Sequence, residues 1–152
     1  VQSPQQTLEA LNSTLFAVQL FVYIIAAISL AVGGIGIMNT MYTSVLERTK
    51  EIGIMKSIGA RNSAIFTIFF IESGFLGTVG GIIGIAFGMF FAYGISFAGR
   101  ILLGSELIQA SISPLLVLGA LIFSFALGTL FGVLPAYRAS KLNPVDSLRE
   151  SK

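Results

Sequence analysis

The chain has 152 residues, of which 55% are apolar and only 11% charged, with a net charge of +2 and a mean hydropathy of +0.90. Ordinary soluble domains carry about 25% charged residues, and a soluble fold of this composition would expose large apolar patches and aggregate. The chain has no cysteine and no histidine, so it lacks a disulfide framework and the commonest metal ligand and general base. We therefore predict an all-α membrane protein with no metal site and no catalytic residue.

Three long stretches carry no charged residue at all, namely 10–46, 73–99 and 107–137. A membrane-crossing helix needs roughly 20 apolar residues. We predict three transmembrane helices, at 16–42, 63–97 and 114–135. The chain opens at Val1 with polar sequence following it and has no initiator methionine, so we expect a piece of a longer protein or a processed product.

The first predicted helix begins before its membrane span. Ser3 and Pro4 have the form of a capped helix start, and apolar residues then recur at intervals of three and four, the a/d pattern of a coiled-coil seam, at Leu8, Leu11, Leu15, Val18, Val22 and Ile25. A helix from Pro4 to about Tyr42 would be roughly 58 Å long, against a hydrocarbon core of about 30 Å. We predict that 4–15 forms an extracytoplasmic stalk whose seam needs a partner helix. The alternative is packing of this seam on a neighbouring loop.

The segment 46–61, LERTKEIGIMKSIGAR, holds six of the sixteen charged residues. Lysine and arginine beside membrane spans mark the cytoplasmic side. As a helix, the segment would place Ile52, Ile54, Met55 and Ile58 on one broad arc that also contains Glu51, with Gly59 as a plausible end. Such a mixed face suits a groove in another protein better than a membrane surface. The alternative is a basic loop that only fixes topology.

Glycines spaced four residues apart mark the second and third predicted helices. The second helix, which Asn62 can cap, holds Gly77 with Gly81, and Gly80, Gly84 and Gly88. The third holds Gly128 with Gly132. Such faces let another helix pack closely, either within one protomer or across a dimer seam.

Glu72 is an acidic residue close to the inner end of the second span. A carboxylate costs about 2.5–3.5 kcal/mol at the bilayer centre and less near the headgroups. One interpretation is a polar group inside the membrane that pairs with Arg61 or Lys56. The other is a side chain at the level of the inner headgroups.

A connection at 98–113, with Arg100 and Glu106, precedes the third helix, which Ser113 and Pro114 start as a cap and a first-turn proline. We predict that Pro135 ends this helix and that a tail at 136–152 follows. Asn143, Pro144 and Asp146 again form a cap signal, which predicts a short helix at about 145–150.

Lysine and arginine divide eight to one between the two sides of the predicted spans. The larger group is Arg48, Lys50, Lys56, Arg61, Arg138, Lys141, Arg149 and Lys152, and Arg100 stands alone. The positive-inside rule therefore predicts a multi-pass protein of the cell membrane, with the N-terminus outside and the C-terminus in the cytoplasm. Tyr42 and Tyr137 fall at the predicted inner interface, where tyrosine is enriched.

Several motifs resemble one family in the same order along the chain. They are VGGIGIMNTMYTSVLERTKEIGIMKSIGAR at 32–61, the region of Glu72 with its glycines, and PAYRASKLNPVDSLRES at 135–151. They resemble the FtsX-like, MacB-type permeases of ABC transporters. The family permease has four membrane helices, with an extracytoplasmic domain between the first and second. This chain is similar to the second, third and fourth, and the missing first helix would be the partner of the Leu8 seam.

The resemblance also implies a function for the central segment. In the family, the segment matching 47–59 is a coupling helix that docks on the ATPase, the permease dimerises, and ATP drives movement that reaches the extracytoplasmic side. The residues that would carry this coupling are Glu47, Arg48, Thr49, Lys50, Glu51, Ile52, Gly53, Met55, Lys56 and Gly59. The chain has no GxxxxGK[ST] phosphate loop, so we expect ATP and Mg on a separate cytoplasmic ATPase and no cofactor on this chain.

Two other function classes need groups that this sequence largely lacks. An ATP-independent channel or ion-coupled carrier would mark its route with several ionisable groups in the membrane, and here only Glu72 is a candidate. An intramembrane enzyme would need a nucleophile with a base, paired carboxylates or a metal. We therefore expect a permease fragment with no nucleic-acid partner.

Overall fold

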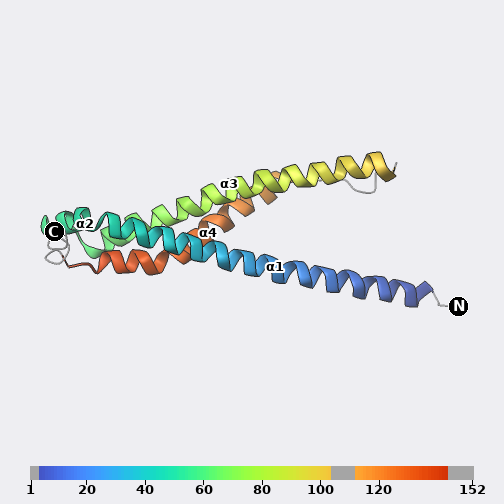
Figure 1. Cartoon of the computed structure of the whole chain (residues 1–152), viewed down its shortest axis with the longest axis horizontal. Helices are drawn as coiled ribbons and strands as arrows, with labels where there is room; N and C mark the ends of the chain where they lie inside the picture. The colour runs from blue at the N-terminus through green and yellow to red at the C-terminus, as the bar shows by residue number, and fades with distance from the viewer. Residues whose placement is uncertain (1–3, 104–111, 144–152) are drawn as a thin grey trace. The chain divides into compact units, whose positions relative to one another are not determined.

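The computed structural model describes residues 4–103 and 112–143. All regular structure in these two ranges is helical, in the order α1 (Pro4–Glu47), α2 (Thr49–Ser57), α3 (Asn62–Leu103) and α4 (Pro114–Ser140) (Figure 1). Helices α1, α3 and α4 are long and apolar enough to cross a membrane, which confirms the predicted fold class. The predicted Ser3 cap, Glu106 and the predicted helix at 145–150 lie outside the described residues.

The chain divides into two units, 1–36 and 37–152. The first unit holds most of α1, a helix of 44 residues, about twice the length that a span requires. Leu8, Leu11 and Leu15 are exposed along it. The hydroxyls of Ser13 and Thr14 donate to the Ala10 carbonyl at 2.9 and 2.8 Å, so these polar side chains are satisfied by their own helix. The predicted leucine seam therefore lies open for a partner.

In the second unit α3 and α4 pack side by side (Figure 1). Their backbones meet at glycine, because a Cβ added to Gly77 would lie 2.8 Å from the Gly128 Cα. A Cβ on Gly81 would lie 2.5 Å from the Ser124 hydroxyl oxygen, and one on Gly132 would overlap the Ser73 side chain. Small residues at such positions permit the close approach of two membrane helices. The GxxxG pairs Gly77/Gly81 and Gly128/Gly132 are thus used within the chain.

The other glycines of α3 lie on a different face. A Cβ on Gly80, Gly84 or Gly88 would meet nothing within 4 Å, and all three residues are exposed. The glycines of the predicted second span therefore separate into a face that packs on α4 and an open face.

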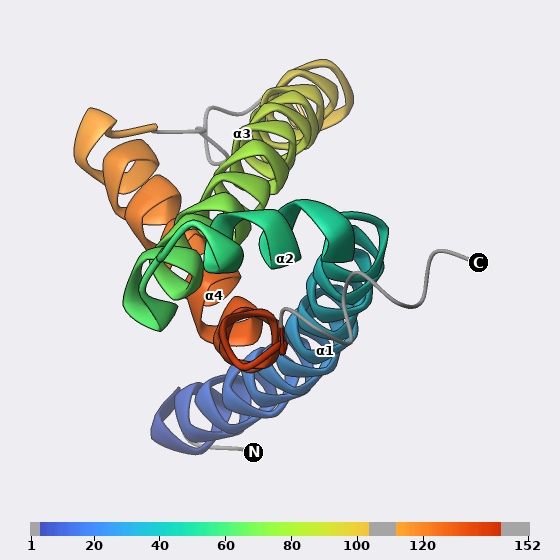
Figure 2. The same cartoon turned by 90° about the vertical axis from the view of Figure 1, so that its left-hand side faces the viewer.

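All four helices contribute to one apolar cluster, which lies at the end of the second unit that carries α2. Figure 2 shows α2 lying across the ends of the other helices. We call this cluster the junction. Its buried residues are Met41 and Val45 from α1, Ile52 from α2, Ile65 and Phe69 from α3, and Ala136 and Ala139 from α4. Burial of these side chains fixes α2 onto the long helices.

The sequence predicted an N-cap for α4 and an N-cap for α3, and only the first is confirmed. The Ser113 hydroxyl accepts the Leu115 N–H at 3.3 Å, so the predicted cap of α4 is confirmed. At α3 the carbonyl of Arg61 accepts the N–H groups of Ala64 and Ile65 at 3.0 and 3.3 Å. The helical hydrogen bonds therefore begin one residue earlier than predicted, and Asn62 is the first helical residue rather than the cap.

Two helix ends lie beyond their predicted positions. Helix α3 continues to Leu103, past the predicted end of the span at 97. Helix α4 continues through Pro135 to Ser140, so the prediction that Pro135 ends this helix is wrong. Proline removes one N–H donor from a helix, and α4 runs through this position without ending.

Candidate functional site

Helix α2 follows α1 with a break of one residue. The Arg48 N–H donates to the Ser44 carbonyl at 3.1 Å, and the Arg48 carbonyl accepts from the Ile52 N–H at 3.0 Å. The Thr49 hydroxyl reaches back to the Val45 carbonyl at 3.0 Å. These backbone and side-chain hydrogen bonds therefore connect the end of α1 directly to the start of α2.

The C-terminus of α2 is a glycine-ended turn. Gly59 has φ +99°, a conformation that glycine adopts without the steric cost of a Cβ. Its N–H donates to the Lys56 carbonyl at 3.0 Å, and the Ala60 N–H donates to the Met55 carbonyl at 2.9 Å. These two bonds form a Schellman motif, so the prediction of a helix end at Gly59 is confirmed.

One face of α2 points into the junction. Ile52 is fully buried, Gly53 is buried beside it, and Met55 packs against the cluster from its edge. The sequence pattern predicted Met55 on the docking arc, whereas in the structure Met55 packs against the junction.

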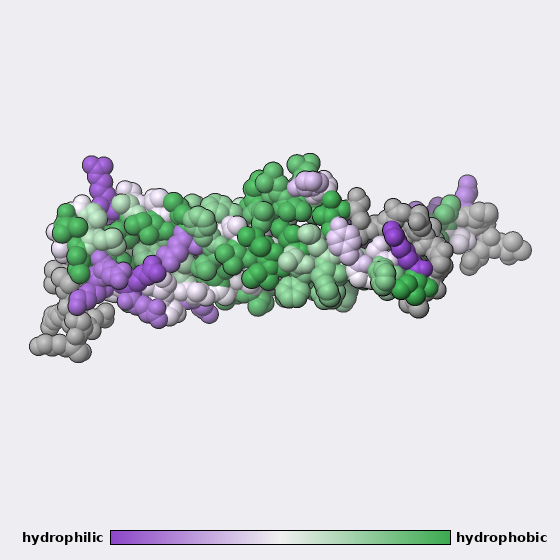
Figure 3. Space-filling model, turned by 90° about the horizontal axis from the view of Figure 1, so that it is seen from above, coloured by the Kyte–Doolittle hydropathy of each residue, from purple (hydrophilic) through white to green (hydrophobic). Residues whose placement is uncertain are grey.

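The opposite face is exposed and mixes charged with apolar groups. Ile54 is 49% exposed and Ile58 is 82% exposed. Figure 3 shows hydrophilic side chains gathered around α2, with apolar side chains among them. We use the name outer face of α2 for five exposed residues in this helix or next to its ends, namely Glu47, Lys50, Glu51, Ile54 and Ile58.

Ile54 and Ile58 were absent from the predicted coupling residues, although the sequence analysis noted both on its arc. With Lys50 they recur at intervals of four, the spacing of one helical face. This spacing could have identified Ile54 and Ile58 as docking residues if the predicted arc had been divided into a buried half and an exposed half.

Lys56 points away from the outer face toward the end of α4. Its ammonium group donates to the carbonyls of Ser140 and Leu142 at 2.7 and 2.6 Å. Lys56 is therefore not the partner of Glu72.

Glu72 pairs with Arg48, the residue between α1 and α2, at 3.5 Å. The interpretation that paired Glu72 with Arg61 or Lys56 is therefore wrong, because the fold brings α3 past Arg48, which lies 24 positions away in sequence. The Arg48 side chain is 50% exposed and that of Glu72 is 31% exposed.

This pair should contribute little to stability, since exposed ion pairs typically contribute about 0.2–1 kcal/mol. We expect a coupling free energy below about 1 kcal/mol in a double-mutant cycle of Arg48→Met and Glu72→Gln. The cycle is measured by denaturant unfolding in detergent micelles. A coupling above about 2 kcal/mol would instead indicate an ion pair held away from water.

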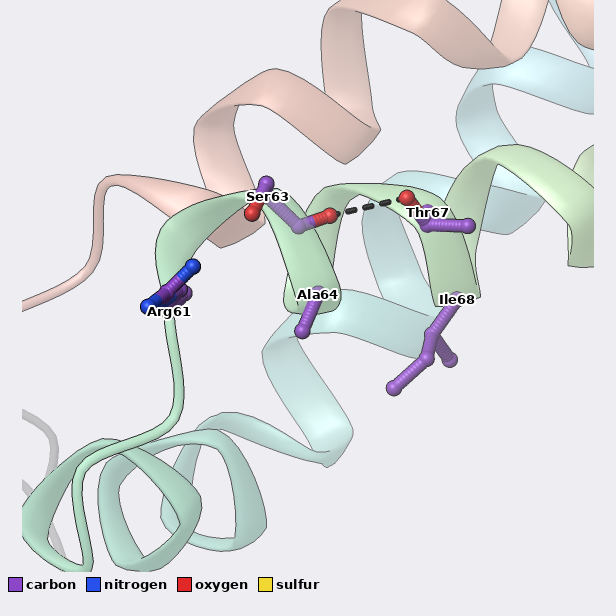
Figure 4. A pocket seen from close by; sticks show the side chains of 5 residues that line it. All are labelled: Arg61, Ser63, Ala64, Thr67 and Ile68. Atoms are coloured by element: carbon purple, nitrogen blue, oxygen red, sulfur yellow. Dashed lines mark hydrogen bonds between the residues drawn. The ribbon is translucent and has the colours of Figure 1, made fainter.

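The first turns of α3 border an open hollow of about 470 Å³, lined by Arg61, Ser63, Ala64, Thr67 and Ile68 (Figure 4). The Thr67 hydroxyl donates to the Ser63 carbonyl at 2.8 Å. All five residues belong to one segment, and Arg61 is the single charged group among them. The hollow thus lacks the several ionisable groups expected of an ion route.

A second polar contact joins α1 to α4 beside the junction. The Arg138 guanidinium donates to the Tyr42 hydroxyl at 3.2 Å and lies 5.4 Å from the centre of the Tyr42 ring. A cation over an aromatic face is attracted by the ring quadrupole. This contact therefore adds to the apolar packing that joins the helix ends.

Comparison with known proteins gives consistent matches over most of the chain. The family model described as FtsX-like permease C-terminal matches residues 23–144. The chain is 44% identical over 149 residues to the uncharacterized ABC transporter permease MJ1507 of Methanocaldococcus jannaschii, covering 98% of this chain and 37% of that protein.

Two further relatives are similar over slightly shorter ranges. The macrolide export ATP-binding/permease protein MacB of Bdellovibrio bacteriovorus is 48% identical over 141 residues, 93% of this chain and 21% of that protein. The uncharacterized ABC transporter permease YknZ of Bacillus subtilis is 48% identical over 126 residues, 82% of this chain and 30% of that protein. The chain thus spans well under half the length of each of these curated relatives.

Proposed function

This chain belongs to the FtsX-like permease C-terminal family of ABC transporters, and from that premise we propose that it couples ATP hydrolysis to movement or export across the membrane. In this proposal a separate cytoplasmic ATPase binds the outer face of α2, and the junction passes its movement to the long helices. The proposal concerns the whole transporter, in which this chain would supply part of the membrane portion.

The observation that carries the proposal is the two-sided character of α2. Ile52 lies in the junction, while Ile54 and Ile58 are exposed between charged residues. Exposed apolar side chains at helical spacing are typical of a helix that lies in a groove of a partner protein. A segment that only fixed topology would not need apolar side chains on its outer face.

Charge supports a cytoplasmic position for α2 and for the tail at 136–152. Eight of the nine lysine and arginine residues lie in these two segments and the residues beside them, and such residues accumulate on the cytoplasmic side. We therefore place the N-terminal part of α1, residues 4–15, outside the membrane as a stalk.

The nucleotide site is proposed to lie on the ATPase. The 152 residues contain no GxxxxGK[ST] loop, the sequence that cradles phosphates and positions Mg²⁺. MJ1507 and YknZ are named as permeases alone, which favours a separate ATPase subunit. MacB is named as an ATP-binding/permease protein, so a fused ATPase is the alternative arrangement.

Two further partners complete the proposal. One is a second permease copy, for which the open face of Gly80, Gly84 and Gly88 offers a close-packing surface. The other is a preceding membrane helix and extracytoplasmic domain in the parent chain. That helix would cover the exposed Leu8, Leu11 and Leu15.

The proposal is tested by purifying the tagged full-length parent protein from native membranes in a mild detergent. We expect an ABC ATPase to copurify in a fixed ratio, as a separate polypeptide. An ATPase domain within the tagged polypeptide itself would correct the subunit arrangement and leave the coupling proposal standing.

Absence of any ATPase, even after crosslinking, would overturn the proposal in favour of a channel or ion-coupled carrier. The carrier alternative predicts that transport depends on the Glu72 carboxylate. Proton- or sodium-driven flux that needs no ATPase and is abolished in Glu72→Gln would support it.

A further inference from the structure

Lys56 belongs to α2, but its side chain forms hydrogen bonds at the end of α4. It is partly buried, and its ammonium donates to two carbonyls at the end of α4, those of Ser140 and Leu142. Because these acceptors lie 84 and 86 positions further along the chain, the contact is purely tertiary. Nothing in the sequence pattern of α2 indicates it.

The end of α4 needs this donor. A helix leaves its last four carbonyls without partners inside the helix. Here the Tyr137 carbonyl accepts from the Ser140 hydroxyl at 2.8 Å. The carbonyls of Arg138 and Ala139 accept from the N–H groups of Lys141 and Leu142 at 3.1 and 3.4 Å.

The fourth carbonyl, that of Ser140, accepts from Lys56 at 2.7 Å. Ser140 is only 4% exposed, and a buried carbonyl without a donor is costly. A positive charge is also favourable at a helix C-terminus, where the macrodipole is negative. Lys56 therefore completes the C-terminal cap of α4 from another helix.

We infer that Lys56 is a positioning residue that fixes α2 to the end of α4, so that the two move as one body when the ATPase pulls on α2. This inference rests on the proposed function and adds a second path by which movement of α2 reaches the long helices. Movement of α2 would pass through its covalent links to α1 and α3, and in parallel through Lys56 to α4. Helix α4 then carries it to α3 through the close contact of Gly77 with Gly128.

The test measures the distance between α2 and α4 in the full-length transporter in lipid nanodiscs. Spin labels are placed on Ser57→Cys and Lys141→Cys, both exposed positions. This chain has no cysteine of its own to remove. Pulsed electron resonance gives the distance distribution without nucleotide and with a non-hydrolysable ATP analogue, in samples diluted with unlabelled protein.

In the otherwise unchanged protein we expect one narrow distribution that is the same in both states. Lys56→Met should broaden this distribution at least twofold and make it nucleotide-dependent. Lys56→Arg should restore the narrow distribution, because a guanidinium also donates to two carbonyls. Arg61→Met is the control, since Arg61 is an exposed cation at the same end that lies outside this contact.

A distribution in Lys56→Met as narrow as in Arg61→Met, in both states, would overturn the inference. So would a nucleotide-dependent distance in the protein with Lys56 intact. If the ATPase fails to bind any variant, the proposed function falls, and the nucleotide-free comparison of Lys56→Met with Arg61→Met still decides whether Lys56 fixes α2 to α4.

Discussion

Replacing Ile58 with aspartate should weaken binding of the ATPase by about 30-fold or more. Ile58 is 82% exposed and follows the helix end at the tip of α2, so the protein alone loses little when it changes. In a complex, truncating a central apolar anchor typically costs about 2 kcal/mol or more, and 2 kcal/mol corresponds to about 30-fold in Kd. Aspartate adds the cost of burying a charge.

Binding is measured with purified ATPase titrated onto the full-length permease in nanodiscs. Ile101→Asp is the matched control, since Ile101 is also highly exposed but lies near the other end of α3. We expect the control to bind the ATPase normally. Equal binding by Ile58→Asp and Ile101→Asp would show that the outer face of α2 is not the docking surface.

Replacing Gly77 with leucine should separate α3 from α4. A Cβ at Gly77 would lie 2.8 Å from the Gly128 Cα and 3.0 Å from the Gly128 nitrogen. Both are backbone atoms, so no side-chain rotation can relieve the overlap. Overpacking costs about 1–3 kcal/mol and occasionally more, and we expect about 3 kcal/mol here because the obstacle is a helix backbone.

The change in free energy of unfolding is measured by denaturant titration in detergent micelles. Gly84→Leu is the matched control on the same helix, because a Cβ there meets nothing within 4 Å. It should leave the protomer stable, and reduced self-association would then support the open face as a dimer contact. Equal destabilisation by both variants would contradict the assignment of the two glycine faces.

The glycines show which features of the fold a sequence pattern can predict and which it cannot. Hydropathy and charge were sufficient to predict three membrane-crossing helices, because the bilayer imposes length and composition directly. The spacing also predicted faces for close packing. Gly77/Gly81 and Gly80/Gly84 have the same GxxxG pattern, however, and only the position of α4 decides which one is covered.

Some contacts and one helix end were predicted wrongly from the sequence, because they depend on the tertiary fold. One interpretation paired Glu72 with Arg61 or Lys56, but Glu72 pairs with Arg48, while Lys56 binds the end of α4. Pro135 was expected to end α4, yet the helix continues through it to Ser140. For Glu72 and Lys56 the partner lies in a distant part of the chain, which a pattern along one segment does not reveal.

The most direct test of ATPase docking is a photocrosslink from the tip of α2. A benzoylphenylalanine at Ile58 in the tagged full-length protein, irradiated in native membranes, should join an ABC ATPase, identified by mass spectrometry. The same probe at Ile101 should not. A probe at Ile58 that captures only lipid, or reaches no ATPase in membranes that contain the intact transporter, would contradict the account of α2 as the ATPase-docking helix.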